Sequence, residues 1–285
     1  MTLREALQFG CEQLASSQLR YPREDALLLL GLVLRWPRIR LVTSSDSELA
    51  RPQELLFRQL IALRRSHFPI QYMSGQQEFY GRDFRVRPGV LIPRAETEVI
   101  VEEALKIAAG LEEETVSVLD VGTGSGCIAV SLACEDPRIL VTAIEPSPVA
   151  LQVAELNCRR HGCRDQVSLI CCELRNLPKL GKFQMIVSNP PYLDSGSSGK
   201  IDRGVLDHEP PEALFGESGR WSVFLEIFEA AGGLLGAEGS ILLELAHGHL
   251  GNVMSLGQDH GWATRAVHKD LAGRSRVAVF GREKK

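Results

Sequence analysis

The chain has 285 residues, of which 44% are hydrophobic and 24% charged, and its formal net charge is −4. This composition excludes a disordered or fibrous chain, and the length suits one large or two modest globular domains. The slight acidity argues against general binding to nucleic acid. The longest apolar run, residues 26–34, is too short for a membrane span, which needs about 20 residues.

Seven cysteines are scattered along the chain without a Cys-x-x-Cys pair. Such a set indicates reduced thiols and favours a cytoplasmic protein. Cys158, His161, Cys163 and Cys171 stand close in sequence, but their spacing matches none of the usual zinc patterns, so no metal is expected. The first residues lack the apolar core of a signal peptide, which favours the same location.

The first part of the chain, residues 1–75, is predicted to be helical because leucines recur at helical spacing. Prolines 22, 37, 52 and 69 stand near the expected helix ends. This segment is expected to be a small helical bundle, and its many arginines indicate solvated helix faces or, alternatively, a basic surface that docks a partner. Residues 76–96 then introduce aromatic residues, Gly and Pro and a short alternating stretch, which predicts a hairpin and connector.

From residue 97 to 285, strands and helices alternate. Strands are expected at 116–121, 140–144, 167–171, 183–188 and 240–245, with an antiparallel pair at 263–268 and 276–280. Helices are expected at 97–109, 127–134, from Pro148 to Gly162 behind an N-cap Ser147, and at 222–235. The alternation predicts an α/β fold with a mostly parallel, doubly wound sheet. The run SGSSG at 195–199 is predicted to be a flexible loop.

The sequence Asn189-Pro190-Pro191-Tyr192 follows the strand predicted at 183–188. Open α/β sheets bind ligands at the carboxyl ends of their strands. The Asn189 amide can donate and accept hydrogen bonds in one plane, and prolines turn the chain while leaving backbone carbonyls to accept. Tyr192 adds a flat aromatic face. This combination predicts a site for a planar –NH2 group, although an ordinary Pro-rich turn is the alternative.

A glycine-rich turn, Asp120-Val121-Gly122-Thr123-Gly124-Ser125-Gly126, stands between the first predicted strand and its helix. Glycines let a ligand approach the backbone, and the turn presents N–H groups at a helix start. The spacing is G-x-G-x-G and not the G-x-G-x-x-G of dinucleotide-binding proteins. The alternative is a tight strand-to-helix turn without a ligand.

Two acids follow the next two strands. Glu145 could accept from both ribose hydroxyls of a nucleoside, because a carboxylate offers two acceptor oxygens. Glu173 could accept from an adenine amino group, with Leu174 against the ring. Either acid could instead be an ordinary solvated residue. Together with the glycine-rich turn they predict an adenosine across neighbouring strand ends, with Asn189 beside the reactive end of the ligand.

These motifs resemble S-adenosylmethionine-dependent methyltransferases that modify planar nitrogens. Further segments are similar to the HemK/PrmC family of protein-(glutamine-N5) methyltransferases of class-1 release factors. They are PIQYMSG at 69–75, FYG at 79–81, LIPRAETE at 91–98, HEPPEAL at 208–214 and KDLAG at 269–273. The chain departs from the usual family pattern at Ala95, Glu145, Glu173 and in Glu244-Leu245-Ala246-His247.

The resemblance implies a Rossmann-like methyltransferase sheet behind an N-terminal helical domain that docks the substrate. It implies that S-adenosyl-L-methionine lies over residues 122–126 (Gly122, Thr123, Gly124, Ser125 and Gly126), with its ribose on Glu145 and its adenine near Glu173 and Leu174. The glutamine of a Gly-Gly-Gln loop would enter against Tyr192. Asn189, Pro190 and Pro191 would hold its amide, and hydrogen bonds there would align the nitrogen with the methyl group.

Three other functions remain open from sequence. An amino-methyltransferase acting on adenine or guanine in DNA or RNA would share the NPPY motif but would need a basic groove. A nicotinamide-linked dehydrogenase would need the G-x-G-x-x-G spacing, and a non-catalytic binding module would not need intact motifs. We therefore expect a release factor as partner, with no membrane and no stable nucleic-acid binding.

Overall fold

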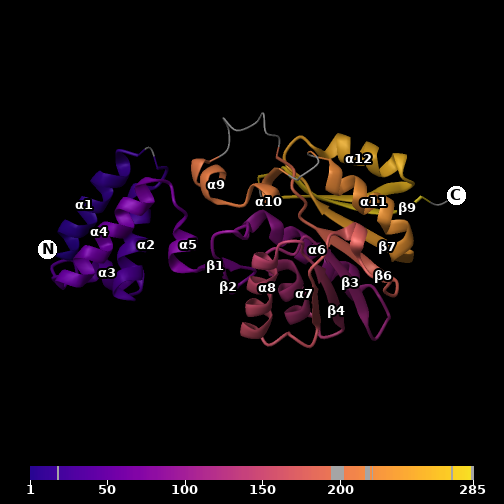
Figure 1. Cartoon of the computed structure of the whole chain (residues 1–285), viewed down its shortest axis with the longest axis horizontal. Helices are drawn as coiled ribbons and strands as arrows, with labels where there is room; N and C mark the ends of the chain where they lie inside the picture. The colour runs from indigo at the N-terminus through magenta and orange to yellow at the C-terminus, as the bar shows by residue number, and fades with distance from the viewer. Residues whose placement is uncertain (18, 194–201, 216–218, 220, 271, 284–285) are drawn as a thin grey trace. The chain divides into compact units, whose positions relative to one another are not determined.

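The computed structural model describes the whole chain except residues 18, 194–201, 216–218, 220, 271 and 284–285. The chain divides into two compact units, one formed by residues 1–76 with a later segment around residues 202–208, the other by the remainder (Figure 1). The sequence-based division had placed residues 202–208 in the second domain. The predicted loop at 195–199 lies outside the described residues.

The first unit is a bundle of helices, in agreement with the helical spacing of its leucines. Its helices are α1 (Leu3–Ala15), α2 (Pro22–Leu34), α3 (Arg38–Thr43), α4 (Arg51–Arg65), α5 (Ile70–Ser74) and α9 (Arg203–His208). Helix α9 joins the unit through His208, whose imidazole lies 3.0 Å from the Ser66 carbonyl oxygen and packs edge-on against Phe68. No helix in the described ranges is long and apolar enough to cross a membrane.

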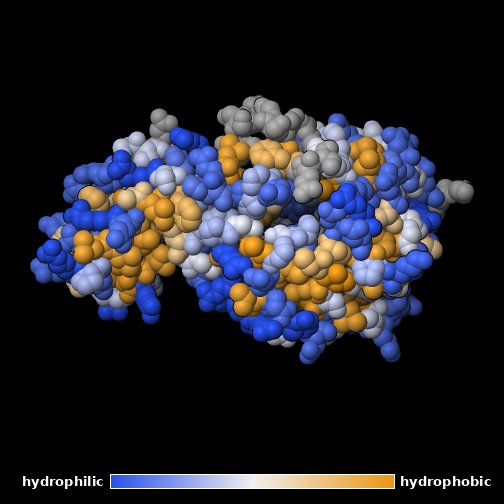
Figure 2. Space-filling view, viewed as in Figure 1, coloured by the Kyte–Doolittle hydropathy of each residue, from blue (hydrophilic) through white to orange (hydrophobic). Residues whose placement is uncertain are grey.

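Part of the helical unit's surface is apolar. Figure 2 shows hydrophobic residues at the surface of this unit, and its exposed large side chains include Leu28, Ile39 and Val42. Arg40 lies over the ring of Trp36, with 3.8 Å between the guanidinium carbon and the ring centroid. The unit therefore presents apolar and cationic groups together.

The second unit opens with the hairpin β1 (Gln76–Phe79) and β2 (Arg82–Arg85) and then builds one large sheet. In the described residues its strand order is β5-β4-β3-β6-β7-β9-β8. The strands are β3 (Val116–Val121), β4 (Ile139–Ile144), β5 (Val167–Ile170), β6 (Phe183–Ser188), β7 (Leu235–Glu244), β8 (Trp262–Lys269) and β9 (Ser275–Arg282). Strands β5, β4, β3, β6 and β7 are parallel, and β9 and β8 are antiparallel. This confirms the predicted α/β fold class.

Helices cover both faces of the sheet (Figure 1). One apolar core joins the strands to α6 (Glu98–Ala109), α7 (Cys127–Glu135) and α8 (Pro148–Arg160). The short helix η1 (Ala95–Thr97) directly precedes α6. The other joins them to α11 (Ser222–Leu234) and α12 (Leu250–Asp259). Successive strand residues alternate between the two cores, since Val118 belongs to the first and Leu119 to the second. The short helices η2 (Leu174–Asn176) and α10 (Pro211–Phe215) complete the unit.

Several boundaries differ from the predicted ones. Strand β7 begins at Leu235, five residues before the predicted start at residue 240. Helix α12, which contains two glycines, was not predicted from the sequence. At one of them, Gly257, an added Cβ would lie 3.0 Å from the Phe280 ring, so close packing accounts for the glycine. These errors arise where tertiary contacts override local preference.

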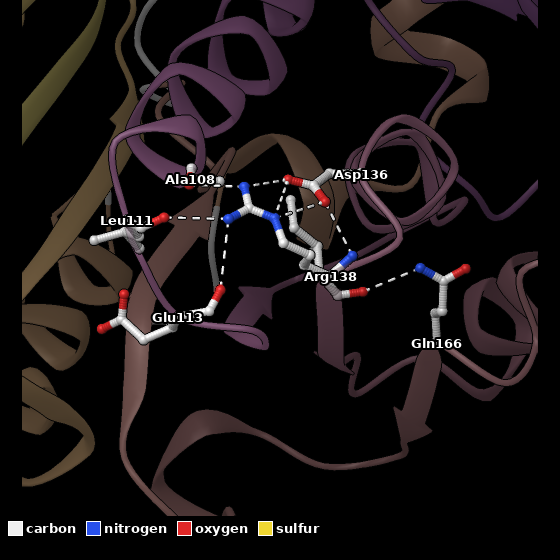
Figure 3. A network of polar contacts seen from close by, with 7 residues as sticks. Ala108, Leu111, Glu113, Asp136, Arg138 and Gln166 are labelled. Carbon is white, nitrogen blue, oxygen red and sulfur yellow. Dashed lines mark hydrogen bonds and ion pairs between the residues drawn. The ribbon is translucent and has the colours of Figure 1, made fainter.

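A polar network fixes the amino ends of β3 and β4 (Figure 3). The guanidinium of Arg138 donates to the carboxylate of Asp136 and to the backbone carbonyls of Ala108, Leu111 and Glu113, at distances of 2.8–3.5 Å. Its own carbonyl accepts from the Val116 N–H at 2.9 Å. Arg138 thus ties the end of α6 and the following loop to the start of the sheet.

Candidate active site

A pocket of about 580 Å³ opens at the carboxyl ends of the parallel strands in the second unit. This volume falls in the range of small-molecule sites, roughly 300–1,000 Å³. Most of the predicted site residues line the pocket: Gly122, Thr123, Gly124, Ser125, Glu145, Glu173, Leu174, Asn189, Pro190 and Pro191. The fold therefore brings together motifs that stand as much as 69 residues apart in the chain.

The glycine-rich turn exposes its backbone to the pocket. Gly122, Gly124 and Gly126 all have positive φ, at 73°, 56° and 81°. A Cβ on Gly122 or Gly124 would meet no atom within 4 Å, so open space lies beside this backbone. At Gly126 a Cβ would lie 3.1 Å from the Cβ of Ala154, which would push α7 away from α8. A ligand can thus approach the turn closely.

Two carboxylates hold this turn. Asp120 is fully buried, and its Oδ2 accepts from the Thr123 hydroxyl at 2.6 Å. Burial raises the pKa of Asp120 to about 7. Glu145 Oε2 accepts from the Gly124 N–H and Oε1 accepts from the Ser147 N–H, both at 2.9 Å. Burial also raises the pKa of Glu145, although these two backbone hydrogen bonds lower it.

Asn157, which the sequence did not single out, links the turn to the hairpin. Its Nδ2 donates to the Ser125 carbonyl at 2.8 Å and to the Arg85 carbonyl at 3.1 Å. Its Oδ1 accepts from the Arg85 N–H at 2.7 Å, and the side chain is fully buried. One helical side chain therefore positions the connector and the glycine-rich turn together.

The predicted adenine end has a partly open wall. Leu174 is buried, whereas Glu173 is about one-third exposed and paired with Arg175. Glu145, Glu173 and Arg175 line the same pocket, as do Glu212 and Glu226. The charge around the pocket is therefore mainly negative.

The side chain of Asn189 is held from behind by a buried chain of hydrogen bonds. Asn189 Nδ2 donates to the Thr97 hydroxyl oxygen at 3.1 Å, and that hydroxyl donates to Glu244 Oε2 at 2.6 Å. Thr97 and Glu244 are 2% and 1% exposed. Burial raises the pKa of Glu244 to about 7, while Thr97 and Arg276 act to lower it.

Tyr192 is not among the residues that line the pocket. Its hydroxyl donates to Glu244 Oε1 at 3.4 Å, and its ring meets His249 edge-on with 6.3 Å between centroids. Burial raises the pKa of this phenol. Its predicted role as a wall for the substrate therefore stays a prediction, and its observed contacts are with Glu244 and His249.

Two of the family-like segments meet at one ion pair. Arg94 of the 91–98 segment contacts Glu209 of the 208–214 segment at 2.5 Å, and Glu209 also accepts from the Ile92 N–H at 3.1 Å. The Glu209 carboxylate is 1% exposed, and Arg94 lines the pocket. Glu209 thereby fixes the segment that carries Thr97.

Sequence reasoning missed the supporting residues Thr97, Asn157, Glu209 and Glu244 as members of the site. The available signal for Glu244 was its position at the carboxyl end of a strand, beside the strand that precedes Asn189. The described part of the chain contains no group of three or more His, Cys, Asp or Glu side chains arranged to hold a metal ion.

Comparison with known proteins identifies related chains. Residues 5–75 match the model described as PrmC N-terminal domain, and residues 102–206 match the model described as methyltransferase small domain. A solved methyltransferase from Pyrococcus furiosus has a TM-score of 0.50 at 18% identity, covering 72% of this chain and 91% of that one. At this identity the similarity concerns the fold alone.

Two full-length relatives are more similar in sequence. The release factor glutamine methyltransferase of Koribacter versatilis (strain Ellin345) is 39% identical over 280 residues, which are 98% of each chain. The protein of the same name from Geobacter sulfurreducens is 38% identical over 282 residues, 99% of this chain and 96% of its own. On this coverage and identity, the chain is a methyltransferase and belongs to the release factor glutamine methyltransferase family.

Proposed function

We propose that the protein transfers a methyl group from S-adenosyl-L-methionine to the side-chain amide nitrogen of the glutamine in the Gly-Gly-Gln motif of peptide-chain release factors. The observation that carries this proposal is the position of Asn189 at the pocket, held by Thr97 and Glu244. Membership of the family supplies the expected substrate.

The pocket fits the cofactor by its chemistry. The open backbone at Gly122 and Gly124 suits close approach of the methionine part, and Glu145 offers carboxylate oxygens for ribose hydroxyls. Leu174 offers an apolar surface for the adenine. When bound, S-adenosyl-L-methionine supplies an electrophilic methyl group on a positively charged sulfur, and the acidic lining of the pocket favours that charge.

The residues near Asn189 then orient the substrate. Asn189 Nδ2 donates to the Thr97 hydroxyl, so Asn189 Oδ1 is the atom that can accept a hydrogen bond from one N–H of the substrate amide. The Pro190 carbonyl can accept from the second N–H. An amide nitrogen is a weak nucleophile because its lone pair is delocalised into the carbonyl. Two acceptors align this nitrogen and favour the positive charge that develops on it as the N–C bond forms. As this bond forms, the bond between the methyl group and the sulfur breaks and the sulfur becomes neutral, and the nitrogen then releases one proton to solvent.

The alternative, a base-modifying methyltransferase, receives less support from the pocket. Nucleic-acid substrates bring phosphates, which are bound mainly by Lys and Arg. Here four glutamates, Glu145, Glu173, Glu212 and Glu226, line the pocket beside Arg94 and Arg175, and Arg94 is already paired with Glu209. This charge suits a neutral glutamine better than a polyanion.

We assign the docking of the release factor to the helical unit. Its exposed Leu28, Ile39 and Val42, together with Arg38 and Arg40 on either side of Ile39 in the sequence, provide the apolar and cationic groups that a protein partner would bind. This role is independent of the chemistry at Asn189 and can be tested by substitutions confined to residues 1–65.

The test is an acceptor panel. The full chain is incubated with S-adenosyl-L-methionine carrying a labelled methyl group and, separately, a release factor, the same factor with its Gly-Gly-Gln glutamine changed to alanine, naked DNA and ribosomal RNA. We expect label on the unaltered release factor alone. Label on either nucleic acid, with none on the release factor, would favour the alternative.

A further inference from the structure

We infer that Thr97 and Glu244 are positioning residues that set which way the Asn189 carboxamide faces, so that Oδ1 and not the NH2 group meets the substrate amide. This inference rests on the proposed function, because it assumes an acceptor that donates N–H groups. It concerns two side chains that do not belong to the Asn-Pro-Pro-Tyr motif and that lie 92 and 55 residues away from Asn189 in the chain.

The direction of the hydrogen bonds follows from the number of protons available. The Thr97 hydroxyl has one proton, and the 2.6 Å contact with Glu244 Oε2 uses it, because a carboxylate can only accept. The hydroxyl oxygen must then accept from its other neighbour. At 3.1 Å that neighbour is Asn189 Nδ2, so the amide nitrogen points to Thr97 and the amide oxygen is turned from it.

Without Glu244 this order would not be fixed. A hydroxyl can donate to an amide oxygen as readily as it accepts from an amide nitrogen, and the two ends of a carboxamide have nearly the same shape. The rotated Asn189 would present two N–H donors to the two N–H donors of a substrate amide. Glu244 prevents this because it removes the only proton that Thr97 could give.

The surroundings of Glu244 suit this role. The carboxylate ends β7, 1% exposed, and its second oxygen accepts from Tyr192 at 3.4 Å. Charged groups from two other elements act on it: Arg276 of β9 favours the ionised form, and Glu96 of η1 opposes it. The pKa of Glu244 is about 7, so below that pH the carboxyl group is protonated and can donate a hydrogen bond as well as accept one. A protonated Glu244 could donate to Thr97, and the direction of both hydrogen bonds between Glu244, Thr97 and Asn189 would then be reversed.

The experiment compares Thr97→Val with Thr97→Ser in the full chain. Valine keeps the volume of threonine and removes the hydroxyl, whereas serine keeps the hydroxyl. Thr142→Val on β4, outside the pocket lining, serves as the matched control. We expect Thr97→Val to lower kcat for methyl transfer to the release factor about tenfold, the worth of one such hydrogen bond. Thr97→Ser should stay within about twofold of the wild type, and neither should change the Kd for the cofactor.

A second arm uses pH. The kcat of the wild type and of Thr97→Ser should fall as pH drops below about 7, and the fall should be absent in Glu244→Gln and Thr97→Val. Equal kcat in the Val and Ser variants would overturn the inference. So would a loss of activity in Thr97→Val that came with a weakened Kd for the cofactor, because that pattern indicates that the whole pocket, and not the Asn189 side chain alone, is disturbed.

The orientation itself can be read without turnover. In ¹⁵N-labelled protein, the Asn189 side-chain NH2 signals, assigned by their loss in Asn189→Ala, should exchange slowly with solvent in the wild type and in Thr97→Ser. They should exchange faster in Thr97→Val. If the wild type failed to methylate the release factor, the proposed function would be wrong, while these spectra would still decide whether Thr97 holds Asn189.

Discussion

Polar networks occupy both ends of the sheet in the second unit, and they differ in kind. At the amino end, Arg138 meets a carboxylate and three backbone carbonyls and lowers the pKa of Asp136. At the carboxyl end, the carboxylates of Glu145 and Glu244 are buried with neutral donors as their hydrogen-bond partners, and their pKa values are raised. The first network is complete within the fold, whereas the second leaves acceptors for a ligand.

This difference separates stability from function. Charged groups that are fully paired within the protein contribute to the stability of the fold. Buried ionisable groups with shifted pKa values at a pocket are typical of active sites. Substitutions at the amino end should therefore change stability and leave activity intact, whereas those at the carboxyl end should change activity, cofactor binding or the way in which stability depends on pH. The four predictions below test this separation, from the largest expected effect to the smallest.

Asn189→Ala should lower kcat by about 100-fold or more, because the substrate amide loses an acceptor that aligns its nitrogen. The Kd for the cofactor and the Tm should stay near wild-type values, since Asn189 is only partly buried. Steady-state kinetics with a release factor, calorimetry and thermal unfolding measure the three quantities. Turnover near that of the wild type would show that Asn189 has no role in the chemistry.

Glu145→Ala should weaken cofactor binding by about 10- to 100-fold, the usual worth of hydrogen bonds to a charged group. Part of the loss would come from the turn, because Glu145 also accepts from the Gly124 N–H. Glu173→Ala is the comparison: Glu173 is more exposed and paired with Arg175, so its effect should be smaller. Calorimetric affinities that did not differ from wild type would remove Glu145 from the cofactor site.

Glu244→Gln should change how stability depends on pH. The pKa of Glu244 is raised from 4.5 to about 7 in the folded protein, so the folded state binds a proton that the unfolded state has lost in this window. The unfolding free energy should therefore fall as pH rises from about 4.5 to about 7 and then level off, by up to about 1.4 kcal/mol per pH unit for each such group.

In Glu244→Gln, the unfolding free energy should fall less steeply with pH, because the contribution of Glu244 is lost. The contribution of Asp120, whose pKa is also raised to about 7, should remain. Carboxylates with lowered pKa values, such as Asp136 and Asp270, act in the opposite sense at lower pH and leave this window undisturbed. Denaturant unfolding across the pH range measures the slope. An identical slope in the wild type and the variant would mean that Glu244 is already ionised at pH 4.5.

Arg138→Ala should lower the Tm by a few degrees and leave kcat unchanged at temperatures where the variant is folded. Three backbone carbonyls and Asp136 would lose their donor, but none of them lines the pocket. Arg159→Ala, which removes an exposed pair within α8, is the matched control and should change the Tm less. A fall in kcat at Arg138 would break the separation between the two ends of the sheet.

The sequence predicted the parts of this molecule that local patterns encode. Strands β3 and β6 lie where their apolar runs indicated, and Ser147 caps α8, accepting from the Ala150 N–H at 3.3 Å. The glycine-rich turn and the residues that follow the strands lie together because parallel strands end at one edge.

The supporting residues could not be predicted in the same way. Thr97 and Glu244 are 147 residues apart, and Arg94 and Glu209 are 115 apart. No local periodicity pairs such positions; only the packing of α6 against the end of β7 brings the first pair together. A threonine directly before a helix is typical of an N-cap residue. Thr97, however, makes no capping hydrogen bond, and its hydroxyl donates to Glu244 instead.

The central claim, that the pocket delivers a methyl group to a glutamine amide nitrogen, is tested most directly by locating the methyl group. A release factor treated with the enzyme and S-adenosyl-L-methionine is digested, and the Gly-Gly-Gln peptide is sequenced by tandem mass spectrometry. The account predicts one added methyl group on the side chain of that glutamine, absent with Asn189→Ala. A methyl group on any other residue, or an unmodified peptide from an enzyme that binds its cofactor, would contradict it.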